Sequence, residues 1–247
     1  MPMSNYTNKR LLVLHRNANT DYLSTGFRGG GKYLGPEKAL VNSFIRDNPL
    51  DVAEGMTGAI FIEPKIESGY PDLVIVLIEE KEIENWRPPE IALSEADFRL
   101  IQYLYQVGPG SESEISKGFG LKSRKSLDRL ASVGWLKLAK NEFSPTQLSR
   151  FSATEIIAVE AKISDPRRAL LQAATNTWFA SRSIVLTGSK TRAMRIKPHA
   201  RSSRLGLWVF DDSQLVQLLK GTKFSQPRSY VSRLFDYWAR VAITNQR

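Results

Sequence analysis

The stretch that decides the fold is Thr154–Ile163, which reads TEIIAVEAKI. Its β-branched and apolar residues predict a strand. Glu160 and Lys162 lie two residues apart within it, so the two-residue period of a strand places both on one face. The other face takes four apolar residues, Ile157, Val159, Ala161 and Ile163. Charged side chains inside an apolar strand are costly unless something compensates them, so this strand is a candidate for a functional site.

The segments that follow predict an α/β fold. Pro166–Ala180 is amphipathic with helical spacing, and Arg182–Thr187 predicts another strand. A strand, a helix and a strand in this order form a crossover unit in which the two strands run parallel. Further along we expect a strand at Leu205–Phe210 and helices at Ser213–Leu219 and Ser229–Ala242. The last helix carries aromatic residues that predict core packing, Tyr230, Phe235, Tyr237 and Trp238.

The segments before this strand complete the core. Gly58–Glu63 and Tyr70–Glu79 are apolar runs separated by turn residues, and together they predict a hairpin. Leu11–His15 predicts a short strand, and Gly35-Pro36-Glu37 opens a helix that ends before Asn48. With the region between the hairpin and Thr154 set aside, the expected order of elements is α-β-β-β-α-β.

Two short motifs, placed in this order of elements, make the chain similar to a known family. Pro71-Asp72 begins one strand and Glu160-Ala161-Lys162 lies in another, and with them the chain resembles the PD-(D/E)xK, restriction-endonuclease-like nuclease superfamily. The resemblance implies a mixed-sheet core and metal-dependent hydrolysis of phosphodiester bonds in DNA. It implies that Asp72 and Glu160 bind Mg²⁺, with Mn²⁺ as a substitute, and that the backbone carbonyl of Ala161 is a further ligand. Lys162 would then act on the attacking water.

The resemblance extends to two further residues. It implies that Glu37 supports the metal site from the upstream helix, and that Gln172 matches a glutamine often found on the helix after the Glu-x-Lys strand. In the family a Tyr commonly follows that glutamine four residues later, whereas this chain has Asn176. The alternative reading of Glu160 and Lys162 is an ordinary edge-strand ion pair, which leaves Asp72 unexplained.

The composition changes between the hairpin and Thr154. The charged stretch Glu79–Pro89 predicts a linker, and three helical patterns follow, at Ser94–Val107, Ser111–Gly118 and Ser123–Val133. An apolar run at Trp135–Leu138 and a polar turn before Phe143 predict a small β-wing. Residues 89–150 therefore resemble a winged helix, inserted into a nuclease core formed by residues 1–88 and 151–247.

The third helix of this insert would be the recognition helix. Its first turns carry residue types that contact phosphates and base edges, Lys122, Ser123, Arg124, Lys125 and Arg129. Winged helices also serve as protein-interaction modules, so an ordinary solvated charged face stays open as the alternative.

The charge of the chain favours a polyanionic partner. It has 35 Lys and Arg against 25 Asp and Glu, a net charge of +10. Between Arg182 and Arg204 there are seven basic residues and no acid, in what we expect to be mostly loop. We assign DNA contact there to Lys190, Arg192 and Arg195; the alternative is a flexible basic loop without a defined role. Charge alone does not separate DNA from acidic lipid.

The composition also excludes several classes of protein. The absence of Cys rules out disulfides, Cys-based zinc fingers and iron–sulfur clusters, and two His rule out a His-rich metal site. The chain has no run of 18 apolar residues, and its polar start does not resemble a secretory signal. We therefore expect a cytoplasmic protein without a membrane partner.

These observations predict a Mg²⁺-dependent DNA endonuclease, a deoxyribonuclease whose winged helix aids DNA recognition. The alternative is a non-catalytic DNA-binding or assembly protein that keeps the nuclease fold as a scaffold. The sequence leaves open the physiological role, the DNA specificity, and whether the protein acts as a homodimer or in a larger nucleoprotein assembly.

Overall fold

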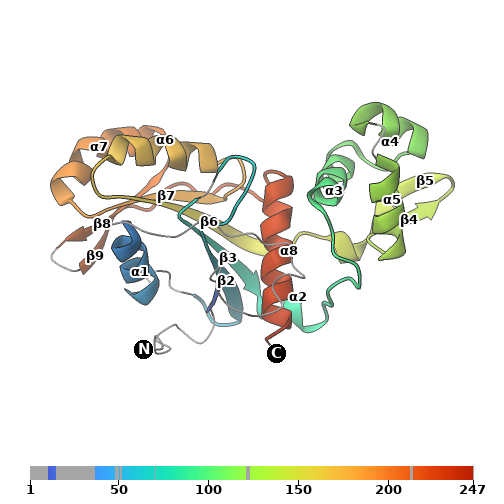
Figure 1. The fold of residues 1–247 in the computed structure, drawn as a ribbon, viewed down its shortest axis with the longest axis horizontal. Coiled ribbons are helices and arrows are strands. Elements are labelled where there is room, and N and C mark those ends of the chain that lie inside the picture. The colour runs from blue at the N-terminus through green and yellow to red at the C-terminus, as the bar shows by residue number, and fades with distance from the viewer. Residues whose placement is uncertain are drawn as a thin grey trace.

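The computed structural model describes residues 11–14, 37–47, 50, 52–69, 71–120, 123–211 and 214–246. Within these ranges the chain has an α/β fold built on a mixed seven-stranded sheet, with helices on both faces (Figure 1). Residues from the middle of the chain form a separate group of three helices and a two-stranded hairpin. The predicted α/β class is therefore confirmed.

The strand order in the large sheet is β1-β2-β3-β6-β7-β8-β9. β1–β2, β6–β7 and β7–β8 are parallel pairs, and the other neighbouring strands are antiparallel. The strands are β1 (Leu11–Leu14), β2 (Met56–Ile62), β3 (Leu73–Glu79), β6 (Ala153–Lys162), β7 (Arg182–Thr187), β8 (Gly206–Asp211) and β9 (Gln214–Leu219). The predicted hairpin is β2–β3, and the stretch with Glu160 and Lys162 is the central strand β6.

Helices cover the two faces of the sheet and leave β6 buried between them. On one face, α1 (Glu37–Asp47) packs Leu40, Val41 and Phe44 against the odd-numbered residues of β6. On the other face lie α6 (Pro166–Asn176), α7 (Lys190–Ser202) and α8 (Tyr230–Thr244). The alternation expected for β6 is confirmed, because Ile157, Val159 and Ala161 share one apolar cluster.

The expectation of a loop after β7 is wrong. Residues 190–202 form α7, in spite of Pro198 inside the helix. Ala193, Ile196 and Ala200 recur at helical spacing and are buried against β7 and β8. Because β7 and β8 are parallel, the chain has to cross over the sheet between them, and burial of this apolar side outweighs the hydrogen bond lost at Pro198.

The predicted helix at Ser213–Leu219 is also wrong, because Gln214–Leu219 forms strand β9 (Ser213 lies outside the described residues). Its apolar residues Leu215, Val216, Leu218 and Leu219 are spaced in a way that fits a helix or a strand. Antiparallel pairing with β8 decides between the two. Tertiary context thus overrides an ambiguous local pattern.

The stretch predicted as a linker is ordered and packed. It contains α2 (Glu80–Glu84), and both Ile83 and Trp86 are buried in the main core. Arg240 of α8 lies over the Trp86 ring, with its guanidinium carbon 4.4 Å from the ring centre. The connection therefore holds the middle of the chain to the sheet instead of leaving it loose.

The middle of the chain has the predicted three helices and hairpin. They are α3 (Glu95–Val107), α4 (Glu112–Phe119), α5 (Ser123–Ser132), β4 (Leu136–Ala139) and β5 (Glu142–Pro145). Ser94 caps α3 in a capping box with Asp97, as the sequence predicts for the helix start. Lys140 and Asn141 both have positive φ, which suits the two-residue turn of the β4–β5 hairpin.

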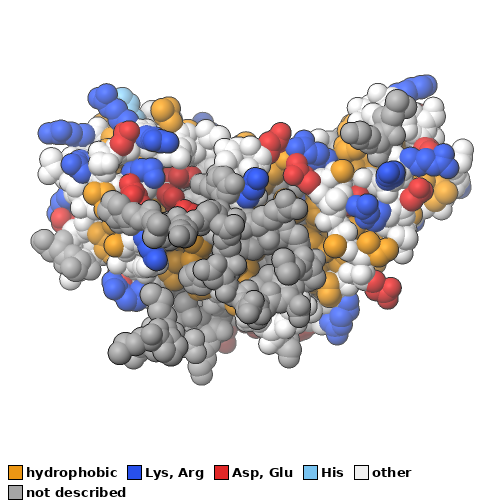
Figure 2. Space-filling model, in the orientation of Figure 1, with side chains coloured by type: hydrophobic (Ala, Val, Ile, Leu, Met, Phe, Trp, Pro, Cys, Tyr) orange, Lys and Arg blue, Asp and Glu red, His pale blue; other side chains and the backbone are white. Residues whose placement is uncertain are grey.

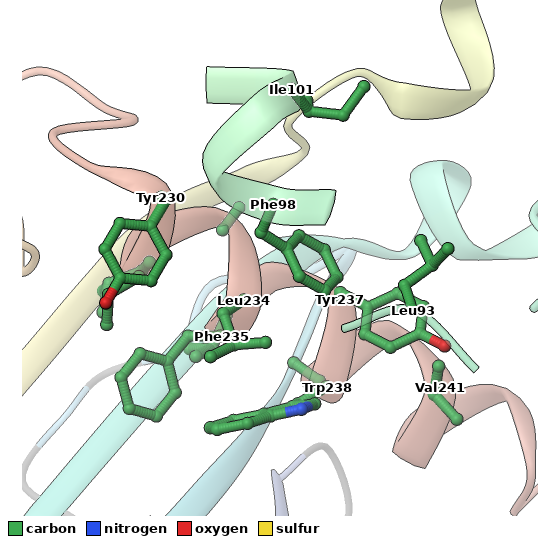
Figure 3. Close-up of a cluster of buried hydrophobic side chains, with 14 of the residues drawn as sticks. Leu93, Phe98, Ile101, Tyr230, Leu234, Phe235, Tyr237, Trp238 and Val241 are labelled. Carbon is green, nitrogen blue, oxygen red and sulfur yellow. The ribbon is translucent and has the colours of Figure 1, made fainter. Parts of the chain in front are cut away.

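α8 joins this group, which we call the insert, to the sheet. Figure 1 shows α8 between the sheet and α3, and Figure 3 shows Phe98 and Ile101 of α3 beside α8. The Phe98 and Tyr237 rings have their centres 5.2 Å apart, and Arg233 donates to Gln102 at 2.7 Å. The insert and the sheet therefore share one core, and the aromatic residues of α8 are buried as predicted.

Candidate functional site

Asp72, Glu160 and Lys162 come together at one end of the paired strands β3 and β6. Leu73 pairs with Val159 in the antiparallel ladder, which places Asp72 beside the end of β6. Asp72 Oδ2 accepts a hydrogen bond from the Ala161 backbone N–H at 2.8 Å, and Lys162 Nζ lies 4.0 Å from the same oxygen. The structure thus brings together the three residues that the sequence singled out.

Glu160 is held in a site unfavourable to its charge. Its side chain is buried, with the residue only 2% exposed, and Oε1 accepts a hydrogen bond from Asn176 Nδ2 at 2.7 Å. Oε2 is buried and has no hydrogen-bond partner among the described residues. Burial raises the pKa of Glu160 to about 8, and the neighbouring Asp72 carboxylate contributes to the rise.

Burial also disfavours the charged form of Asp72. Burial raises its pKa, while the Ala161 N–H and the Lys162 ammonium partly offset the rise. The charge of Glu37 adds to it, so the start of α1 lies close enough to affect this site. The carboxylates of Asp72 and Glu160 thus lie together, with Glu37 near enough to affect Asp72. Lys162 is the one cation found to offset their charge among the described residues.

The helix that follows β6 places two amides over the site. Gln172 and Asn176 are four residues apart on α6, so both face the sheet. Because α6 runs back along β6, Asn176 reaches Glu160 and Gln172 lies one turn closer to the Lys162 end. The Gln172 Oε1 is buried and has no hydrogen-bond partner among the described residues.

Asn176 is the site residue that the sequence analysis missed. Asn176 stands where the family commonly has Tyr, and its amide donates a hydrogen bond to the Glu160 carboxylate. The signal that could have identified it is its spacing of four residues from Gln172. Thr187, which pairs with Lys162 in the β6–β7 ladder, is a second such residue, since its hydroxyl is buried and lacks a partner in the described part of the chain.

The donor set of this site fits a hard divalent cation. Glu160 Oε2, Gln172 Oε1 and Thr187 Oγ1 are among the buried side-chain atoms that lack a hydrogen-bond partner within the described ranges, and these three belong to residues at or beside the end of β6. Mg²⁺ prefers carboxylate, carbonyl and water oxygens. No group of three or more His, Asp or Glu side chains suited to a metal occurs in the described residues. A metal here would therefore depend on two carboxylates, the Ala161 carbonyl and water.

The basic residues predicted for α5 differ in their local contacts, with one firm ion pair and one long contact between exposed side chains. Arg129 donates to the buried Asp97 at 2.9 Å, and Arg124 lies 3.7 Å from Glu112. Ser123 is buried with its hydroxyl 2.9 Å from that of Ser116, and Lys122 lies outside the described residues. Lys125 is exposed, and no ion pair is found for it in the described part.

The basic residues predicted after β7 lie on α7. Some of them are paired with other residues and some are not. Lys190 pairs with Asp211 at 2.8 Å, and Arg192 donates to the backbone carbonyl of Ile163, directly after Lys162. Arg195 is exposed and makes no ion pair within the described residues. These contacts attach the start of α7 to the strand end that carries the candidate site.

A search of the described residues finds no helix with the length and hydrophobicity needed to cross a membrane. Comparisons of the chain with protein-family models, with curated proteins and with solved structures found no match.

Proposed function

We propose that the protein is a metal-dependent DNA endonuclease with a restriction-endonuclease-like core and a winged-helix insert. The observation that carries the proposal is the meeting of Asp72, Glu160 and Lys162 at adjacent strand ends, around a buried Glu160 oxygen that lacks a partner in the described chain. The order α1, β2, β3, β6, α6, β7 is the α-β-β-β-α-β order that the resemblance implies.

The metal chemistry would take place between β3 and β6. Asp72, Glu160 and the Ala161 carbonyl would hold Mg²⁺ or Mn²⁺, which when bound polarises the scissile phosphate and lowers the pKa of a bound water. The Ala161 N–H orients Asp72, and Asn176 orients Glu160 through Oε1 so that Oε2 stays available. The raised pKa of Glu160 supports this assignment, because a bound cation would remove the cost of its negative charge.

Lys162 would act on the water and the phosphate. Its ammonium is near Asp72, and its side chain is partly exposed, so it can meet a substrate that approaches from solvent. A positioned amine can orient or deprotonate the attacking water and stabilise the negative charge of the transition state. The products are a 3′ or 5′ phosphate and a hydroxyl, without a covalent intermediate.

The insert would aid DNA recognition. Three helices followed by a hairpin with a tight turn support the winged-helix assignment, and Arg124 and Lys125 are exposed on α5. Because α3 shares a core with α8, the insert would present α5 in a defined position relative to the sheet.

The test is incubation of the protein with circular and linear DNA in Mg²⁺, Mn²⁺ or a chelator. We expect cleavage with either metal, none with the chelator, and none from Asp72→Ala. Glu90→Ala, which removes an exposed carboxylate outside the candidate site, serves as the matched control and should cleave normally. A wild-type protein that leaves duplex, single-stranded and branched DNA uncut in both metals would favour the non-catalytic scaffold.

A further inference from the structure

The positive charge of the chain is concentrated in one part of the fold. Residues 164–204, which contain α6, β7 and α7, include nine Lys and Arg and one acid, Asp165. Their net charge of +8 accounts for most of the chain's +10, so the rest of the protein is close to neutral. The net charge therefore describes a local surface and not the whole molecule.

α6 and α7 lie side by side over one face of the sheet (Figure 1). Ala169 and Ala173 of α6 and Ala193 and Ile196 of α7 are buried beneath them. The basic side chains of the two helices consequently lie on the side away from the sheet; Figure 2 shows Lys and Arg at this end of the molecule, with acidic side chains among them, and also on the insert. We call this exposed side the α6–α7 face.

Most of the charge on the α6–α7 face is not neutralised. Arg167, Arg168, Arg195, Lys197, Arg201 and Arg204 make no side-chain hydrogen bond or ion pair with the described residues. Asp165, the acid of this region, accepts a hydrogen bond from the Arg168 backbone N–H and so caps α6. Like charges gathered on one face repel one another, which favours a polyanion that brings negative charge to them.

α5 of the insert has the opposite arrangement. Its Arg129 is paired with Asp97 and its Arg124 with Glu112, so part of its charge is already balanced. The sequence points to both α5, as the third helix of a winged-helix pattern, and the region after β7 as DNA-contacting elements. The contacts favour α6 and α7, because counterion release requires cations that are not already paired.

The geometry favours a nucleic-acid backbone over a lipid surface. An interfacial helix needs a continuous exposed apolar side, whereas the apolar side of α7 is buried on the sheet and the large apolar side chains exposed on α6 and α7 are single residues, Leu171 and Met194. Five of the six unpaired cations are Arg, whose planar guanidinium matches phosphate oxygens. Arg192 also attaches α7 to Ile163, next to Lys162, so a backbone lying on this face would lead to the candidate site.

We propose that the α6–α7 face is the main binding surface for the phosphodiester backbone, and that it contributes more affinity than α5. The identity of the partner rests on the proposed nuclease function, whereas the location of the surface rests on the distribution of charge. Arg195 and Arg201 would contact phosphates without regard to base sequence.

Two double variants test this proposal, Arg195→Ala/Arg201→Ala on α7 and the matched Arg124→Ala/Lys125→Ala on α5. Each removes two exposed cations. Affinity for a labelled duplex of random sequence is measured by fluorescence anisotropy with a chelator present, so that cleavage does not contribute. Between about 50 and 200 mM salt, each lost phosphate contact lowers the salt slope by roughly 0.9, so the α7 variant should lose about two units.

At about 100 mM salt this corresponds to a roughly tenfold to hundredfold weaker affinity for the α7 variant, against less than about threefold for the α5 variant. Equal losses, or a larger loss for α5, would overturn the proposal. So would an α7 variant that keeps its DNA affinity but no longer binds phosphatidylserine vesicles, which would identify a lipid partner. Since binding is measured without metal, a protein that binds DNA in this way but never cleaves it would contradict the proposed nuclease function alone.

Discussion

Asp97 in the insert and Glu160 in the sheet are equally buried carboxylates, at 0% and 2% exposure, with opposite surroundings. Asp97 Oδ2 accepts hydrogen bonds from the Ser94 N–H and hydroxyl and from the Arg129 guanidinium, at 2.6, 2.8 and 2.9 Å. Each carboxylate has one further buried oxygen without a hydrogen-bond partner in the described residues, so the contrast lies in the cation and the three donors at Asp97 Oδ2. Glu160 receives one hydrogen bond, from a neutral amide, and lies beside a second carboxylate.

The difference teaches how to tell a structural charge from a functional one. A buried charge that stabilises a fold has its compensation within the protein, as Asp97 has from the start of α3 and from α5. A buried carboxyl group with little compensation for its charge has a raised pKa, and such a group is a candidate for binding a cation that would supply the compensation. By this criterion the Asp97–Arg129 pair is structural, and Glu160 with Asp72 is the candidate for the proposed metal site.

The largest expected effect comes from removing a carboxylate of the candidate site. Asp72→Ala or Glu160→Ala should abolish divalent-cation binding and leave the fold intact, because each change also relieves repulsion between like charges. Calorimetric titration with Mg²⁺ and Mn²⁺ measures the binding, and circular dichroism checks the fold. Unchanged affinity for both metals in both variants would rule out this site.

Asp97 should show the opposite behaviour. Asp97→Ala leaves Arg129 without its partner and removes the cap of α3, so we expect a loss of about 3 kcal/mol in the free energy of unfolding. Urea denaturation measures this value. Asp128→Ala, an exposed acid on α5, is the matched control and should stay within about 0.5 kcal/mol of wild type. Similar stability of the two variants would contradict the structural role of Asp97.

Substitution of Lys162 distinguishes a role in catalysis from a role in balancing the charge of the carboxylates. Lys162→Ala should lower the single-turnover cleavage rate about a hundredfold, equivalent to about 2.7 kcal/mol, and keep metal and DNA binding within a few-fold. Lys162→Met, which keeps the length of the side chain, should behave in the same way. Strong cleavage that persists in both variants would place the active site elsewhere.

The smallest expected effect is on stability as a function of pH. The folded pKa of Glu160 is about 8, above the ordinary value of 4.5, so the folded protein retains a proton that the unfolded chain releases. Wild-type stability should therefore fall as pH rises between these values, by about 2–3 kcal/mol from pH 5 to pH 7 without metal. Glu160→Gln should lack this component. Identical pH profiles of thermal denaturation for the two proteins would show that Glu160 does not bear this cost.

Local patterns predicted much of the fold. The alternation in β6 placed Glu160 and Lys162 on one face, and the helix starts and turns of the insert were recognisable from Ser94, Ser111 and the polar turn before Phe143. These signals depend on residues a few positions apart, so they can be recognised from the sequence alone. The candidate trio followed from the same alternation together with the position of Asp72.

Other features depended on contacts that no local pattern contains. α7 and β9 take their structures from packing and pairing with β8, although Pro198 and an ambiguous apolar spacing argued otherwise. The packing of α3 against α8 could not be predicted either, because the chain between them runs through most of the sheet.

The sequence by itself determined the α/β class, the strand that carries Glu160 and Lys162, the helical insert and the excess of positive charge. Only the tertiary structure decided which charges are compensated. The physical reason is that compensation acts across space between residues far apart in the chain: Arg129 reaches Asp97 over 32 positions, and the Ala161 N–H reaches Asp72 over 89. A basic residue on α5 cannot be distinguished from one on α7 by sequence alone. Its neighbours in the fold determine whether its charge remains available to a partner.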